Sequence, residues 1–362
     1  MCQMIHRFTL IKNILEVIMA VKTCLMIGGG GMAGRWVNRW TEIFGDRVKI
    51  VGLVDINQEI LDQHEKEIGL SKNQLFTDYQ EAISTVKADF CGVATPPQFH
   101  APAVISALEA GMPVICEKPI AGTLEEAKDM VRTANKTGLP CSIIQNYRYA
   151  RNKQEVVRIR DEGRLGRLQH IVGRYAPDYR KYGSWGKAWR HDMDFGMLFE
   201  GSVHHFDMLR FLSGGDPETL MGFGWNPEWS SFKHYSSGMY LMNMDNGTHT
   251  FYEGNSSAAG IINSWHGEYY RAEFEAGTVE ISQGNNITIH RANQSPEIYE
   301  APEIQWEGHD HLFDEFLNWL DGGAPSETQI QKNITSFAMV IAAKDITLDG
   351  QPKKIADYLK DI

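Results

Sequence analysis

The first part of the chain alternates short apolar runs with amphipathic stretches. The apolar runs lie at residues 24–27, 48–54, 89–94, 113–116 and 141–145. Between the first two runs, apolar residues recur at helical spacing from Trp36 to Phe44. Farther on, Thr123 and Glu126 have the spacing of a capping box that opens a helix to about Lys136. Strands that alternate with helices predict a doubly wound, mostly parallel α/β sheet.

This alternation is lost after about Tyr147. A helix-like stretch at 152–161 is followed by strand-like runs at 168–175, 220–225, 237–244, 248–252, 260–266, 270–276 and 278–282. Asp245-Asn246-Gly247 separates two of these runs and is a hairpin signal, and two helices end the chain near 311–320 and 328–348. A run of strands predicts a separate, mainly antiparallel sheet. We therefore expect an N-terminal extension (1–20), an α/β domain (21–146) and an α+β domain (147–362).

The composition fits two soluble globular domains. The 362 residues exceed one ordinary core, and 43% of them are apolar and 22% charged. The net charge of −11 argues against nucleic acid as the main partner. Five scattered cysteines, three of them in apolar runs, favour reduced thiols and a cytoplasmic location.

The apolar runs are too short for a membrane protein. No uninterrupted run reaches the about 18 apolar residues that a spanning helix needs. A signal peptide needs an uninterrupted apolar stretch, and in the first twenty residues Lys12 and Glu16 interrupt it. We expect Met19 to be the natural start and residues 1–18 to be an upstream extension.

A glycine-rich loop follows the first apolar run directly. Residues 28–34 read G-G-G-G-M-A-G and lead into the first helix-like stretch. Strand, glycine loop and helix in this order are typical of a dinucleotide-binding turn. Two registers fit, and we prefer the one that begins directly after the strand. There Gly28 makes the turn, Gly30 admits the pyrophosphate and Ala33 lets the helix pack closely. The alternative is a glycine-rich turn without a ligand.

Asp55 ends the second apolar run. In dinucleotide-binding folds, an acidic residue roughly 20 residues after the glycine loop binds the adenosine ribose, and Asp55 lies close to this distance. A carboxylate there would repel a 2′-phosphate, and no arginine follows in I-N-Q-E. This favours NAD over NADP. The alternative is that Asp55 only caps the helix that begins near Gln58.

Two further loops follow strand ends, where doubly wound sheets bind their ligands. Residues 95–100 read T-P-P-Q-F-H, and residues 117–119 read E-K-P. Pro119 restricts Lys118 to extended geometry, which would aim its ammonium; the alternative is an ordinary surface lysine. The expected cofactor-binding residues are Gly28, Gly30, Gly31, Met32, Ala33, Asp55, Ala94, Thr95, Pro96, Pro97, His100, Glu117 and Lys118.

These motifs resemble those of the glucose–fructose oxidoreductase/inositol dehydrogenase (Gfo/Idh/MocA) family. The resemblance rests on the glycine loop, on A-T-P-P-Q-F-H-A (94–101) and above all on A-L-E-A-G-M-P-V-I-C-E-K-P-I-A (107–121). Further matches are N-Y-R-Y (146–149), E-G-R-L-G-R-L (162–168), W-R (189–190) and E-G-S-V-H-H-F-D (200–207). Together they cover nearly the whole chain after the N-terminal extension.

The resemblance implies an N-terminal Rossmann domain and a second domain with a large open, mainly antiparallel sheet, with the active site between them. It implies hydride exchange between NAD(P) and a carbinol carbon, usually of a sugar, cyclitol or related polyol. It also implies a cis bond between Lys118 and Pro119. Homodimers and homotetramers joined through the open sheet face are common in the family.

The segment 195–212 carries the candidate catalytic residues. Glu200 and His204 are four residues apart, so they share one face of a helix. An imidazole can accept the hydroxyl proton as the hydride leaves, and an ammonium can stabilise the alkoxide. The family motif D-x-x-x-H and the lysine of E-K-P imply that Lys118, Glu200 and His204 are catalytic, with Glu200 in place of the more usual aspartate. We expect Asp207 to orient or charge-stabilise the imidazole.

Two other interpretations of this segment exist. His204 could be a hydrogen-bonded core histidine. Glu200 and His204 could instead ligate zinc with His191, Asp192 or Asp194. The nicotinamide fold makes a metal unnecessary, so we expect none.

The stretch Y-G-S-W-G-K-A-W-R-H-D (182–192) offers aromatic rings and charged donors that suit a hydroxylated ring. Residues 146–148 follow the last α/β strand and should face the same cleft. The alternative for 182–192 is a surface loop at a subunit or domain boundary. The expected substrate-binding residues are Asn146, Arg148, Trp185, Lys187, Trp189, Arg190, His191 and His205.

The leading hypothesis is an NAD-dependent oxidoreductase that acts on a sugar or polyol-like substrate, as a homodimer or homotetramer. One alternative is a glycosidase that uses NAD for a transient oxidation. The other is a non-enzymatic regulator that keeps the NAD fold, against which the retained Lys118 and His204 count.

Overall fold

The computed structural model describes residues 21–260, 265, 267–282 and 284–362. The chain divides into two compact units, each of which is described by itself. The first unit contains the described residues up to Glu117 together with 133–141 and 318–324. The second contains 118–132, 142–317 and 325–362. The expected N-terminal extension lies outside the described residues, and a domain boundary near residue 146 stays a prediction.

A six-stranded sheet has the order β3-β2-β1-β4-β5-β6. Five of its strands correspond to the apolar runs, and the short β3 was not predicted. Each pairing from β3 to β5 is parallel, which confirms the doubly wound sheet that the alternating pattern predicts. The strands are β1 (Lys22–Ile27), β2 (Val48–Val54), β3 (Leu75–Phe76), β4 (Phe90–Val93), β5 (Val114–Cys116) and β6 (Cys141–Ile143).

The helices between these strands are α2 (Gly31–Ile43), α3 (Gln58–Ile68), α4 (Tyr79–Thr85), α5 (His100–Glu109) and α6 (Leu124–Thr137), with the short turns η1 (Lys72–Gln74) and η2 (Pro97–Phe99). Helix α2 buries Trp36, Val37 and Trp40, as its apolar spacing predicts. The expected capping box begins α6. The Glu126 carboxylate accepts from the Thr123 N–H at 2.8 Å, and the Thr123 hydroxyl accepts from the Glu126 N–H at 3.2 Å.

A nine-stranded sheet with the order β14-β13-β12-β11-β7-β10-β9-β8-β15 forms the second unit. All its pairings are antiparallel except that of β7 with β10, so it is the mainly antiparallel sheet that we expect. The expected hairpin at Asp245–Gly247 joins β9 to β10, and most of the strand expected at 260–266 lies outside the described residues. The strands are β7 (Leu168–Tyr175), β8 (Pro217–Trp225), β9 (Ser237–Met244), β10 (His249–Asn255), β11 (Tyr269–Phe274), β12 (Gly277–Ile281), β13 (Asn286–His290), β14 (Glu297–Glu300) and β15 (Lys353–Lys354).

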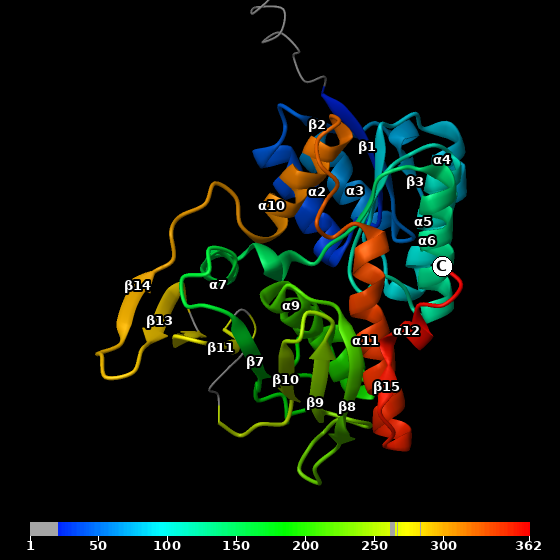
Figure 1. Ribbon diagram of the computed structural model, residues 1–362. Helices are drawn as coiled ribbons and strands as arrows, with labels where there is room; N and C mark the ends of the chain where they lie inside the picture. The colour runs from blue at the N-terminus through cyan, green and yellow to red at the C-terminus, as the bar shows by residue number, and fades with distance from the viewer. Residues whose placement is uncertain (1–20, 261–264, 266, 283) are drawn as a thin grey trace, which may run out of the picture. The chain divides into compact units, whose positions relative to one another are not determined.

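Helices α9 and α11 pack on one face of this sheet, beside β7, β8 and β10 (Figure 1). Every residue of α9 except Phe211 is buried, which makes it the core helix of the unit. None of the helices in the described part of the chain is long and apolar enough to cross a membrane. The helical elements are η3 (Asn146–Tyr149), α7 (Arg151–Asp161), α8 (Trp189–Asp192), the π-helical η4 (Met197–Ser202), α9 (Val203–Ser213), α10 (Gly308–Leu320), α11 (Ile330–Asp349) and α12 (Ile355–Tyr358).

The described cysteines are free and buried, as their apolar neighbours predict. They are Cys24, Cys91, Cys116 and Cys141. Burial raises the pKa of each thiol, which keeps all four in the neutral, unreactive form.

Candidate functional site

The glycines between β1 and α2 shape the first candidate site. Gly28 has φ +99°, and a Cβ there would lie 2.7 Å from the Ala94 carbonyl oxygen, so only glycine fits. A Cβ on Gly34 would lie 2.8 Å from the Gly29 carbonyl oxygen. At Gly30 a Cβ would meet no protein atom closer than 3.8 Å. Packing inside the protein therefore explains Gly28 and Gly34 but leaves open space beside Gly30.

The start of α2 faces this open space. Gly30 is the N-cap residue of α2, and no side chain caps the helix. Gly31 and Met32 are exposed, whereas Ala33 is fully buried, as the preferred register requires. A helix that begins without a side-chain cap presents free N–H groups and the positive end of its dipole. This arrangement suits a phosphate group.

The Asp55 carboxylate is tied to the glycine loop. Its Oδ2 accepts from the N–H groups of Gly29 and Gly30, at 2.9 and 3.2 Å. Its Oδ1 accepts from the Asn57 N–H at 2.9 Å. The N-cap residue of α3 is Asn57, whose side chain accepts from the Glu59 N–H at 3.0 Å. The alternative that Asp55 is merely a helix cap is therefore wrong.

His64 supports the same loop and is absent from the expected site residues. Its Nε2 donates to the Gly29 carbonyl oxygen at 2.9 Å, and its side chain is buried. A histidine inside an amphipathic helix gives no sequence signal of this role, because its partner lies 35 residues away.

The loops after β4 and β5 are also held from inside the unit. His100 is buried, and its Nε2 donates to the Thr95 carbonyl oxygen at 2.7 Å. The buried Glu117 donates its N–H to the Val93 carbonyl oxygen at 2.9 Å. Ala94, Thr95 and Pro97 are half-buried and Pro96 is exposed. Five of the expected cofactor residues thus lie on one short loop with a fixed backbone.

In the second unit, the ammonium of Lys118 faces Glu200. Lys118 Nζ lies 3.4 Å from the Glu200 carbonyl oxygen and 4.0 Å from Oε2 of its carboxylate. The Lys118–Pro119 bond is cis, as the resemblance implies. Only 18% of the Lys118 side chain is exposed, so it is not an ordinary surface lysine.

Arg190 brings a second cation to Glu200. Its Nε and Nη2 both lie 3.2 Å from Glu200 Oε2, and its Nη1 donates to the Trp185 carbonyl oxygen at 3.0 Å. Its guanidinium also lies over the rings of Trp185 and Trp189, at 5.5 and 5.3 Å from their centroids. Glu200 therefore sits between two cations, both of which were expected site residues.

Glu200 and His204 lie on consecutive helical segments. Glu200 belongs to the π-helical η4 and His204 to the first turn of α9. Both side chains are buried. Single π-helical turns within longer helices are frequent at functional sites, because the wider turn redirects the side chains around it.

Two aromatic rings enclose the His204 imidazole. Tyr147 stacks on it with a centroid distance of 4.2 Å and an interplanar angle of 10°. Trp265 meets it edge-on, at 5.9 Å and 89°. Trp265 was not among the expected site residues, because the run around it reads as an ordinary strand.

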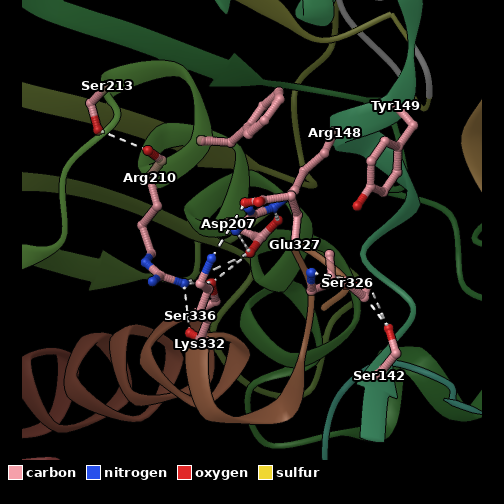
Figure 2. A network of polar contacts seen from close by, with 12 residues as sticks. Ser142, Arg148, Tyr149, Asp207, Arg210, Ser213, Ser326, Glu327, Lys332 and Ser336 are labelled. Atoms are coloured by element: carbon pink, nitrogen blue, oxygen red, sulfur yellow. Dashed lines mark hydrogen bonds and ion pairs between the residues drawn. The ribbon is translucent and has the colours of Figure 1, made fainter. Parts of the chain in front are cut away.

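Asp207 has different partners from the one expected. Its Oδ2 and Oδ1 accept from Arg148 Nε and Nη2 at 2.6 and 2.7 Å, and Oδ1 also accepts from the Ser336 hydroxyl at 2.6 Å (Figure 2). Burial opposes the charge of Arg148, but the Asp207 carboxylate outweighs it and raises the pKa of the guanidinium. The expectation that Asp207 orients His204 is therefore wrong, and Arg148 pairs inside the unit.

Two further expected substrate residues are buried histidines with protein partners. Nδ1 of His205 lies 2.7 Å from the Tyr252 hydroxyl oxygen, and burial lowers the pKa of the imidazole. Nε2 of His191 donates to the Tyr179 carbonyl oxygen at 3.0 Å, and the ring stacks on Phe232 at 4.3 Å. Their contribution to a substrate site stays a prediction.

The remaining expected residues differ in exposure. Asn146 and Trp185 are buried, whereas Lys187 and Trp189 are exposed. The residues of the zinc alternative have separate partners: the Tyr182 hydroxyl donates to Asp192 at 2.7 Å, and Asp194 lies 2.8 Å from His234.

Comparisons with known proteins agree with both halves of this arrangement. Residues 22–145 match the model of an oxidoreductase family with an NAD-binding Rossmann fold, and residues 154–278 match that of the GFO/IDH/MocA C-terminal domain. The uncharacterised protein y4oX of Sinorhizobium fredii is 33% identical over 348 residues, which is 93% of this chain and 96% of y4oX. The 1,5-anhydro-D-fructose reductase of Ensifer adhaerens is 26% identical over 280 residues, or 75% of this chain and 77% of the reductase.

The fold also matches solved structures. An oxidoreductase from Agrobacterium radiobacter, crystallised with NAD+, L-tartaric acid and magnesium, superposes with a TM-score of 0.84. The match covers 93% of this chain and 99% of that protein, at 20% sequence identity.

Proposed function

The chain belongs to the Gfo/Idh/MocA family of oxidoreductases with an NAD-binding Rossmann fold, and on this premise we propose that it is an NAD-dependent dehydrogenase of CH–OH groups. Its substrate is a sugar, a cyclitol or a related polyol. The observation that carries the proposal is the approach of the Lys118 ammonium to Glu200, four residues before His204 on one continuous helical segment.

The first unit suits a dinucleotide. The open space beside Gly30 and the uncapped start of α2 would hold the pyrophosphate. Asp55 would accept hydrogen bonds from the ribose hydroxyls, which favours NAD because a carboxylate repels the 2′-phosphate of NADP. Bound there, the cofactor supplies a nicotinamide ring that accepts or donates a hydride. Thr95, His100 and Glu117 complete the proposed cofactor site.

Each proposed catalytic residue has its own role. His204 accepts the hydroxyl proton during oxidation of the alcohol and returns it in the reverse direction. Lys118 donates a hydrogen bond to the alkoxide oxygen and so stabilises its charge. The Glu200 carboxylate pairs with the Lys118 ammonium and holds it in place, and Arg190 pairs with the same carboxylate.

Relatives and aromatic rings support the substrate class. The Ensifer relative is named for 1,5-anhydro-D-fructose, and the Agrobacterium oxidoreductase was crystallised with NAD+ and L-tartaric acid. In this chain, Trp185 stacks on Tyr179 at 5.4 Å and lies 6.0 Å from Trp265, which itself meets His204. Such rings pack well against the CH faces of a sugar ring, and the hydroxyl groups remain available for hydrogen bonds.

The open sheet face supports a homo-oligomer. Phe223, Leu241, Met221 and Met239 are 72%, 51%, 40% and 40% exposed on neighbouring strands β8 and β9. A contiguous exposed apolar face of this kind marks an interaction surface. We infer that a second copy of the chain covers this apolar face.

The described cysteines support a cytoplasmic location, because their thiols are free and buried.

The test is NADH fluorescence during incubation with NAD and a panel of sugars, cyclitols and sugar acids. Lys118→Ala and His204→Ala should each lower turnover of the active substrate by orders of magnitude while NAD still binds. Lys360→Ala, which removes an exposed surface ammonium, is the matched control. Full activity in both site variants would overturn the assignment. Cleavage of a glycoside without net NADH production would support the glycosidase instead.

A further inference from the structure

Two neighbouring residues of η3 contact two residues of α9 that lie about one helical turn apart. Tyr147 stacks on His204, and the next residue, Arg148, forms the bidentate pair with Asp207. All four side chains are buried. The backbones of η3 and α9 are therefore joined at two consecutive points, one aromatic and one ionic.

The ionic contact is anchored from a third element as well. The Ser336 hydroxyl of α11 donates to Asp207 Oδ1, and Arg210 Nη1 donates to the Ser336 hydroxyl oxygen at 2.7 Å and to the Lys332 carbonyl oxygen at 3.1 Å (Figure 2). Asp207 is thus fixed by both η3 and α11. A carboxylate with so many short contacts has little freedom to shift along the helix axis.

The aromatic contact restricts the His204 ring itself. Tyr147 lies nearly parallel to the imidazole, and Trp265 stands perpendicular to both rings, at 5.9 Å from His204 and 6.2 Å from Tyr147. Rotation of the imidazole out of its plane would bring it against one of these rings. Burial raises the pKa of Tyr147, so its hydroxyl stays neutral. The contact of Tyr147 with the imidazole is the stack of the two rings.

We propose that Tyr147 is a positioning residue for His204, and that the Arg148–Asp207 pair holds η3 and α9 in the register that the stack requires. The inference rests on the proposed function, in which His204 is the proton acceptor. The role of Arg148 and Asp207 in the site is therefore indirect: their ion pair holds Tyr147 in place, and Tyr147 positions the His204 imidazole.

The same turn of chain provides a matched control. Tyr149 is also buried and also stacks on a histidine, His311 of α10, at 4.4 Å and 19°. Its hydroxyl donates to Glu315 at 2.8 Å. Tyr149→Leu therefore removes a similar ring–imidazole contact from η3 but leaves the surroundings of His204 intact.

The first experiment needs no substrate. The full chain and its variants are treated with diethyl pyrocarbonate, which modifies neutral imidazoles, and fragmentation mass spectrometry separates His204 from His205. Tyr147→Leu should speed modification of His204 several-fold, because removal of the ring opens one face of the imidazole. Tyr147→Phe and Tyr149→Leu should leave that rate as in the wild type. An unchanged rate in Tyr147→Leu would overturn the inference.

The second experiment uses the substrate found with the sugar and polyol panel. Tyr147→Leu should lower kcat and leave the KM for NAD unchanged, and Tyr147→Phe should restore kcat. An equal loss in Tyr147→Phe would show that the hydroxyl acts, which would overturn the positioning role. Full activity in His204→Ala would instead disprove the role of His204 as proton acceptor, whatever the modification rates show. Failure of the wild type to reduce NAD with any member of the panel would count against the proposed function itself. Thermal unfolding checks that each variant is folded, and Tyr147→Met replaces Tyr147→Leu if the latter is not.

Discussion

The ammonium of Lys118 lies 3.4 Å from the carbonyl oxygen of Glu200 and 4.0 Å from its carboxylate. The two residues are 82 positions apart in the chain, yet both belong to one compact unit. The carboxylate is nearly buried, so its charge acts on Lys118 with less screening than a surface pair would experience. This geometry makes Glu200 the residue on which the placement of the proposed catalytic lysine depends.

We predict that Glu200→Asp impairs catalysis, although it keeps the charge. The side chain loses one methylene, which withdraws the carboxylate from Arg190, now 3.2 Å away, and from Lys118. We expect kcat to fall about tenfold, equivalent to ~1.4 kcal/mol of transition-state stabilisation, with the KM for NAD unchanged. Steady-state kinetics measure both.

The control for Glu200→Asp is Glu253→Asp on the sheet. Glu253 is also paired with an arginine, Arg174 at 2.8 Å, and is far along the chain from the proposed catalytic set. It should leave kcat unchanged. If Glu200→Asp also leaves kcat unchanged, Glu200 does not position Lys118.

We predict opposite consequences for alanine at two neighbouring glycines. Gly30→Ala adds a Cβ that meets no protein atom closer than 3.8 Å, so thermal stability should hold while the Kd for NAD rises. Gly28→Ala must adopt φ +99° with its Cβ 2.7 Å from the Ala94 carbonyl oxygen, so stability should fall by roughly 1–3 kcal/mol. Thermal unfolding and NAD titration distinguish the two effects. Unchanged NAD affinity in Gly30→Ala would count against the proposed pyrophosphate site.

Strand ends were predictable from the sequence, but long-range partners were not. The alternating apolar runs and the glycine loop fix the order of β1, α2 and β2, so the parallel sheet follows from local pattern. Helical spacing predicts that Asp207 lies near His204, but it does not show which residues of other elements contact Asp207. Arg148 lies 59 residues away in the chain and forms the hydrogen bond with the Asp207 carboxylate that we expected from His204.

Residues that act through the backbone or through another ring also escape sequence reasoning. His64 holds the Gly29 carbonyl oxygen from an ordinary amphipathic helix, and Trp265 meets His204 from a run that reads as a strand. Neither has a motif, because its role depends on packing between elements distant in sequence. The E-K-P turn was recognisable because its chemistry and its backbone geometry lie within three consecutive residues.

We predict that stability falls in mildly acidic solution because of His205. Burial lowers its pKa below the ordinary 6.5, and the Lys153 charge acts in the same direction against the pull of Glu268. The Tyr252 hydroxyl and the rings of Tyr175, Tyr147 and Trp265 also lie beside it. Since the folded pKa is the lower one, the unfolded chain binds more protons below about pH 6.5. Stability is therefore full above that pH and declines as the pH falls towards the folded pKa.

Urea unfolding at about pH 7.5 and about pH 5.5 measures this effect, which is at most ~1.4 kcal/mol per pH unit for one proton. His205→Gln should flatten the decline. His249→Gln, which changes an exposed histidine bonded to Asn243, should preserve it. An identical pH dependence in wild type and His205→Gln would show that another group controls acid stability.

We predict that Phe223→Asp separates the proposed homo-oligomer into smaller species. Phe223 is 72% exposed and pairs across the strands with Met239, beside the pair of Met221 with Leu241. A second copy that covers these side chains would bury apolar area worth ~25 cal/mol per Å². A carboxylate at the centre of that contact would be left without a partner, at a cost of several kcal/mol.

Light scattering after size exclusion measures the mass in solution. The wild type should be a dimer or tetramer, and Phe223→Asp should shift to the monomer or to a smaller assembly. Ile298→Asp is the control, since Ile298 is 66% exposed but lies on β14, at the opposite side of the sheet order from β8. It should keep the wild-type mass. A monomeric wild type, or an unchanged mass in Phe223→Asp, would mean that no second copy covers the apolar face of β8 and β9.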